Sequence, residues 1–81
     1  MAWYEFQWTN EIIEHLAEHG ITPEDFEYVV SNPDRRAKSR SSGRPMALGE
    51  TPDGRFIVCV FEWIDDMTIE PVTGYEPDNE S

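Results

Sequence analysis

The stretch TPDGRFIVCVF, residues 51–61, decides how this chain of 81 residues folds. Its Pro-Asp-Gly portion is typical of a hairpin turn, because proline presets one backbone dihedral angle and glycine accepts the next. The residues from Phe56 to Phe61 are all apolar, as in a strand that is buried on both faces. We therefore expect residues 55–64 to form the central strand of a sheet, covered by helices.

The segment that begins the chain reads as a strand and then a helix. Tyr4, Phe6 and Trp8 recur with the two-residue period of a half-buried strand. Thr9 is a favourable N-cap for the apolar stripe that follows it, and Gly20 is the residue type that most often ends a helix. The pattern predicts an N-terminal strand and a short helix that ends at this glycine.

A second helix is indicated by stronger boundary residues. Thr22 is a suitable N-cap, Pro23 occupies the first helical position, and Asp25 stands three residues after the cap. The dipeptide Asn32-Pro33 closes this helix, because the residue before a proline is disfavoured in the helical region. We expect a short helix between these two boundaries.

Two further segments complete the expected sheet. Residues 67–76 read as a last strand, in which Pro71 indicates an edge or a bulge. Residues 34–43 contain almost nothing to bury, so we expect a loop or a loosely paired edge strand. The predicted fold is α+β, with an N-terminal strand, two short helices and then a three- to four-stranded antiparallel sheet. We expect one domain over residues 1–76 and a flexible acidic tail over residues 77–81.

Electric charge is distributed unevenly along the chain. The net charge is −11, yet all six cations fall between Arg35 and Arg55. Residues 35–49 carry five of them and no acid, so the rest of the chain must hold −16 to reach that total. Such an acidic body repels nucleic acid and anionic lipid at long range, whereas the basic segment attracts a phosphate or an acidic partner locally.

Apolar runs and cysteine content indicate a cytoplasmic protein without a cofactor. The run from Phe56 to Phe61 is far shorter than the roughly 20 residues of a membrane span, and Glu5 interrupts any apolar leader. Cys59 has no second cysteine to pair with and lies in the apolar run, where we expect a buried hydrophobic residue. The chain has no phosphate-binding loop or dinucleotide fingerprint, so we expect no small-molecule cofactor.

The segment from His15 to His19 matches the H-x-x-E-H pattern of inverted zinc proteases. Two imidazoles at positions i and i+4 of a helix can grip a metal ion while Glu18 acts as the base. The chain has only these two histidines, and both fall beside glutamates at the border of the apolar stripe. We interpret them as a solvated helix border and expect no metal site.

The basic segment offers the clearest candidate for binding. The side chains of Arg35, Arg36, Lys38 and Arg40 can pair with the phosphate oxygens of an RNA backbone. The alternative interpretation is that these cations balance a very acidic body and keep an exposed edge strand from pairing with other chains. The residues alone favour the second interpretation.

Several short motifs follow one another over about residues 5–76 and serve as landmarks. They are Phe6-x-Trp8, His19-Gly20-Ile21-Thr22, Gly43-Arg44, Gly49, Asp53-Gly54-Arg55 and Ile69-x-x-Val72-Thr73. Their order resembles that of BrnT-type toxins, which are small relatives of the RelE-like ribonucleases. The resemblance implies a RelE-like fold, metal-independent cleavage of RNA and a DNA-binding antitoxin partner.

Arg44 and Arg55 are the cations that fall on these landmarks, so the resemblance assigns them to catalysis. Their charge would stabilise the negative charge that develops on phosphate as an RNA 2'-hydroxyl attacks it. The candidates for a general base are His19 and Glu18, provided that the end of their helix faces the sheet. A structural alternative is that the two arginines flank the hairpin and pair with Glu50 and Asp53 across it.

The chain also departs from the family pattern at positions that bear on activity. Glu18 stands where the family commonly has lysine, Thr9 stands where it commonly has an acid, and the chain ends in acidic rather than basic sequence. These departures favour a second hypothesis, in which the chain is a catalytically inactive RelE-like protein-interaction module.

Overall fold

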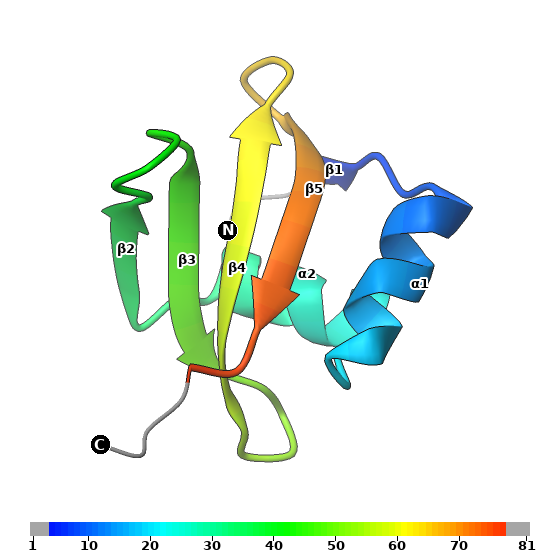
Figure 1. The fold of residues 1–81 in the computed structure, drawn as a ribbon. Helices are drawn as coiled ribbons and strands as arrows, with labels where there is room; N and C mark the ends of the chain where they lie inside the picture. Colours follow the sequence, from blue (N-terminus) through cyan, green and yellow to red (C-terminus); the bar gives the residue numbers. More distant parts are fainter. Residues whose placement is uncertain (1–3, 78–81) are drawn as a thin grey trace.

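A computed structural model describes residues 4–77 as two helices and one five-stranded sheet (Figure 1). The strands lie in the order β1-β5-β4-β3-β2, and neighbours are antiparallel except for the parallel pair β1–β5. The predicted α+β class is confirmed. In chain order the elements are β1 (Glu5–Phe6), α1 (Asn10–Glu18), α2 (Pro23–Ser31), β2 (Arg35–Lys38), β3 (Pro45–Glu50), β4 (Phe56–Trp63) and β5 (Thr68–Tyr75).

The two edges of the sheet refine the prediction. Strands β2 to β5 form the four antiparallel strands expected after the helices, and β2 is the edge strand that was one alternative for residues 34–43. The N-terminal strand β1 joins this same sheet, with Glu5 N–H donating to the carbonyl of Met67 at 2.8 Å. The sheet is mixed rather than purely antiparallel because β1 pairs in parallel with β5.

The helix boundaries follow the predicted caps. Thr9 Oγ1 accepts the backbone N–H of Ile12 at 3.2 Å at the start of α1. Thr22 Oγ1 accepts the N–H of Asp25 at 3.1 Å, and the Asp25 carboxylate accepts the N–H of Thr22 at 3.4 Å. Gly20 has φ of 74°, the left-handed conformation that glycine adopts easily after a helix.

Helices cover one face of the sheet only. The central strand β4 presents Ile57, Cys59 and Phe61 to the buried cluster that also contains Leu16 and Phe26 of the helices. Helix α1 packs on β5, while α2 packs on β3 and β4 (Figure 1). The prediction that helices cover β4 therefore holds for this face.

The opposite face of the sheet carries no helix among the described residues (Figure 1). Val58 and Val60 of β4 lie on it and are nevertheless 3% and 8% exposed. Val58 stands between Leu48 and Tyr75 on the neighbouring strands, so side chains of the sheet itself provide this cover. The edge strands β2 and β1 bound this open face.

Pro71 marks an irregularity in β5, as the sequence predicts. The register against β4 shifts between Val60 and Phe61, which face Thr73 and Pro71 respectively.

Within residues 4–77, neither helix is long and apolar enough to cross a membrane. Residues 78–81 of the predicted acidic tail lie outside the described part of the chain.

Candidate functional site

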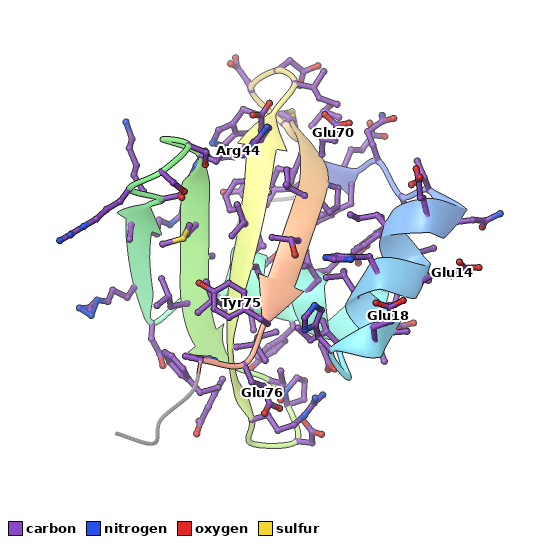
Figure 2. The ribbon with its side chains drawn as sticks, viewed as in Figure 1. Glu14, Glu18, Arg44, Glu70, Tyr75 and Glu76 are labelled. Carbon is purple, nitrogen blue, oxygen red and sulfur yellow. The ribbon has the colours of Figure 1, made fainter. Side chains whose placement is uncertain are left out.

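Arg55 joins the turn between β3 and β4 to the helices. Its guanidinium donates to the carbonyl of Gly20 at 2.5 Å and to the Asp25 carboxylate at 2.6 Å. It also donates to Asp53 at 3.2 Å and lies 3.5 Å from a carboxylate oxygen of Glu76. One side chain thus fastens the α1–α2 corner, the hairpin turn and the residue after β5, where Figure 2 labels Glu76.

The charges in this cluster are fixed by their neighbours. A hydrogen bond from the Thr51 hydroxyl, together with the positive charge of Arg55, lowers the pKa of Asp53 below its ordinary value of 3.8. Partial burial acts to lower the pKa of Arg55, but Asp53 and Asp25 together raise it. The guanidinium stays charged and its donors are committed to acceptors within the chain. Such a group is better suited to holding the fold than to binding a phosphate.

Arg44 stands at the start of β3 and is paired as well. Its Nε donates to a carboxylate oxygen of Glu62 on β4 at 2.6 Å. Both side chains are about two-fifths exposed, so this ion pair lies on the surface. The structural alternative for the two arginines therefore holds for Arg55 with Asp53, whereas the partner of Arg44 is Glu62 and not Glu50.

The structure does not bring Arg44 and Arg55 together. Arg44 lies beside the end of β4, while Arg55 precedes its first residue, Phe56. At about 3.3 Å per residue, the length of this strand separates the two positions by roughly 20 Å. Figure 2 shows the same separation, with Arg44 at one end of the sheet and Glu76, a partner of Arg55, at the other.

His19 lies near Arg55 but has no contact that prepares it for proton transfer. It is exposed at the C-cap of α1, where its backbone N–H donates to the carbonyl of Leu16 at 2.9 Å. Its ring lies 5.2 Å from that of His15, measured between centroids, and His15 is in turn hydrogen-bonded to Thr73 at 2.8 Å. No group of three potential metal ligands occurs among the described residues.

Residues 35–40 of the basic segment behave differently from both arginines above. Within residues 4–77, none of the four cations of residues 35–40 forms an ion pair with a carboxylate. All four are exposed and project from β2 or from the connection that follows it. RNA binding by them stays a prediction, and no described carboxylate neutralises their charge. They are Arg35, Arg36, Lys38 and Arg40.

Aromatic side chains gather at the other edge of the sheet. Phe6 and Trp8 stack with centroids 6.3 Å apart, and both pack edge-on against Phe26. Trp8 also donates to Glu27 at 2.7 Å. Phe6 and Trp8 are partly buried and pack against the core, which agrees with the half-buried strand expected there. They lie at the edge of the sheet opposite β2 and so offer no stacking platform beside the basic segment.

The Cys59 thiol and a surface hollow beside β1 add no catalytic chemistry. Burial raises the pKa of the Cys59 thiol to about 12, so it is an unreactive core residue. A hollow of about 720 Å³ lies where β1 meets the β4–β5 turn, and the carboxylates of Glu5, Asp65 and Asp66 line it. Among the residues that the structure describes, no cation lines it.

The sequence indicates one partner of Arg55, Asp53, but not Asp25 or Gly20. Asp25 has the position of a helix cap, and nothing in its place along the chain connects it to residue 55. Only the fold places the start of α2 beside the hairpin turn. The pairing of Arg44 with Glu62 is a further contact that the sequence analysis does not predict, although a residue near the end of an apolar strand is a candidate for pairing with a cation on the next strand.

Comparison with known proteins identifies no relative, because no family model, no curated protein and no solved structure matches this chain.

Proposed function

We propose that this domain is a catalytically inactive protein-interaction module that binds an acidic partner through its basic segment. The observation that carries this proposal is the division of the cations. Arg44 and Arg55 are occupied by carboxylates of the chain itself, whereas the four cations of residues 35–40 pair with no described carboxylate.

Charge placement supports an acidic partner despite the net charge of −11. The basic edge β2 and the helix α1, on which Figure 2 labels Glu14 and Glu18, lie at opposite sides of the molecule (Figures 1 and 2). At physiological ionic strength, exposed charges are screened over about 8 Å. A segment that contacts β2 therefore experiences its cations more strongly than the acidic helix.

A BrnT-like ribonuclease is the second candidate, and the same four cations favour it. Guanidinium and ammonium groups on one edge can bind the backbone of RNA, as the family resemblance implies. Cleavage needs, in addition, charged groups and a base around one point. The separation of Arg44 from Arg55 and His19 weighs against such a centre and in favour of the interaction module.

The test combines an RNA cleavage assay with a binding assay. Purified protein is incubated with mixed RNA at low salt in the presence of chelator, and is separately titrated with fluorescent polyglutamate. A variant with all four cations changed to glutamine, purified in the same way, serves as the control. The proposal predicts intact RNA with both proteins, and polyglutamate binding by the wild type only.

The opposite results are equally clear. RNA cleavage by the wild type but not by the glutamine variant would establish a metal-independent ribonuclease and overturn the proposal. Equal cleavage by both proteins would indicate either a contaminant or a site elsewhere, and chromatographic co-elution of activity with protein decides between these two. Failure of the wild type to bind polyglutamate would also contradict the proposal.

A further inference from the structure

The edge strand β2 offers backbone groups as well as charge. Strand order places β2 at the end of the described sheet, and each of its four residues is exposed. The opposite edge strand, β1, has only two residues. An edge strand with unpaired N–H and C=O groups is a template on which another extended segment can add.

The register of β2 shows which of its backbone groups are free for such pairing. The N–H of Ser39 donates to the carbonyl of Arg44 at 2.8 Å, and Ala37 faces Met46 in the same register. Hydrogen-bonded pairs alternate along an antiparallel ladder, so Ala37 bonds to β3. The N–H and C=O groups of Arg36 and Lys38 therefore point away from the sheet.

The side chains around this edge define what would fit beside it. Arg36 faces Ala47 of the core, which places the Arg36 and Lys38 side chains on the helix-bearing side of the sheet. Ala37 faces Met46, which places both on the open side. A strand added here would meet Arg36 and Lys38 on one side. On the other side it would meet the apolar surface of Ala37 and Met46, with Arg35 opposite Leu48 at the end of β2.

We infer that β2 binds an extended segment of another protein in which acidic and apolar residues alternate, by strand addition to the sheet. This inference rests on the proposed function and specifies its partner and its mode of binding. The acidic side chains of the segment lie beside Arg36 and Lys38, and its apolar side chains extend the surface of Ala37 and Met46.

The same geometry disfavours a second copy of the chain as the occupant. Pairing β2 with another β2 would bring cations opposite cations, an arrangement that destabilises neighbouring strands. RNA can satisfy the positive charge but cannot form a β-ladder with the backbone of Arg36 and Lys38. The backbone hydrogen bonds thus distinguish strand addition from simple attraction of a polyanion.

The experiment separates these two contributions at Lys38. Substitution Lys38→Ala removes the charge and keeps the outward N–H, whereas Lys38→Pro removes both and leaves the bonds of Ala37 and Ser39 to β3 in place. The probe is a labelled peptide of about ten residues in which Glu alternates with Val or Thr. Fluorescence anisotropy measures its affinity for each protein.

We expect Lys38→Pro to bind the peptide about five- to tenfold more weakly than Lys38→Ala, because one ladder hydrogen bond is lost. A second measurement does not depend on the folding of the proline variant. The same peptide, methylated at alternate backbone nitrogens on the edge that pairs, should lose affinity for wild-type protein, while methylation on its other edge should be tolerated.

Several results would overturn strand addition. Equal affinities for the alanine and proline variants, with no effect of methylation, would show that charge alone binds, and would leave the proposed function intact. Self-association of the wild type through β2 in place of peptide binding would assign the edge to a second copy. Tighter binding of single-stranded RNA than of any acidic peptide would overturn both the strand addition and the proposed function.

Discussion

The hairpin turn around Arg55 and the edge strand β2 both carry arginine, but they place it in different surroundings. At the turn, one guanidinium contacts a backbone carbonyl and the carboxylates of Asp25 and Asp53, and its side chain is 32% exposed. At the edge, Arg35 and Arg36 extend from a strand that is exposed throughout. The same residue type fastens the fold at one place and stays available at the other.

This contrast shows why position along the chain is a poor guide to the role of a cation. The resemblance to BrnT-type toxins predicts a catalytic role for Arg55, yet its donors are occupied inside the domain. The cations outside the landmarks are the ones whose charge is free among the described residues. What separates the two kinds of cation is whether groups of the same chain already pair with them, and not their residue type.

The largest effect should follow substitution of the clamp at Arg55. Arg55→Ala removes the side-chain donor of the Gly20 carbonyl and the charged donor of the partly buried Asp25 carboxylate, which keeps only its bond from the N–H of Thr22. Loss of hydrogen bonds to a charged group of this kind should lower the free energy of unfolding by about 2 kcal/mol. Chemical denaturation monitored by tryptophan fluorescence measures this change.

The conservative substitution Arg55→Lys serves as the matched control. Lysine keeps the charge but cannot reach several acceptors at once as the planar guanidinium does, so it should recover only part of the stability. Full recovery by lysine would show that charge alone matters here and would contradict the clamp. An Arg55→Ala variant as stable as the wild type would refute it altogether.

A smaller effect, which depends on pH, should follow Asp53→Asn. The pKa of Asp53 is lower in the folded protein than its ordinary value of 3.8. Between these two pKa values, the unfolded chain therefore binds more protons than the folded protein. Its contribution to stability is present above pH 3.8 and is lost as the pH falls through the lowered pKa. Denaturation curves of wild type and variant should therefore differ near neutral pH and converge in acid.

Asp65→Asn provides a comparison outside the clamp. The pKa of Asp65 is also lowered, in this case by hydrogen bonds from the N–H of Met67 and from Thr68. The difference in stability between wild type and Asp65→Asn should likewise disappear in acid. The losses of stability caused by Asp65→Asn and by Arg55→Ala should add, because the two sites share no partner. Asp53→Asn should not add fully, since it contacts Arg55 directly.

A minor change is expected when Arg44 is replaced. Its ion pair with Glu62 lies on the surface, with side-chain exposures of 40% and 45%. Arg44→Ala should lower the free energy of unfolding by about 0.5 kcal/mol or less, and added salt should reduce the difference further. A loss of stability comparable to that of Arg55→Ala would mean that the two ends of the hairpin are equally constrained. It would contradict the difference between the surface ion pair of Arg44 and the contacts of Arg55.

The smallest effect on stability should come from the edge itself. Changing Arg35, Arg36, Lys38 and Arg40 to glutamine removes exposed charges that pair with no described carboxylate, so each substitution should alter stability by no more than about 0.5 kcal/mol. Thermal unfolding of this variant measures the sum. A large loss would show that the basic segment holds the fold together and would remove the distinction between the two regions.

The sequence predicts local structure well where short-range chemistry decides it. The threonine caps at Thr9 and Thr22, the stop at Gly20 and the apolar run of β4 depend on neighbours a few residues away. The α+β class follows from the order of these elements. The parallel pairing of β1 with β5 could not be read in this way, because it joins the first described strand to the last.

The candidate site could be predicted less well from the sequence, because many of its contacts also join residues far apart in the chain. The exposed run of cations is visible in the sequence, and the structure keeps it on an edge strand. The occupation of Arg55 by Asp25 and Gly20 depends on contacts between residues far apart in the chain, so no local pattern indicates it. The distance between Arg44 and Arg55 likewise follows from the length of β4 once both ends are placed.

The most direct test of the division between the two regions is an NMR titration of the isotope-labelled protein with polyglutamate. Backbone amides report the edge strand, and the Nε–H signals of the arginines report each guanidinium separately. We expect shifts at residues 35–40, with the Nε–H of Arg55 unchanged. Shifts centred on Arg44, Arg55 and His19 would contradict the account, because they would show that the cations engaged within the fold are the ones that bind.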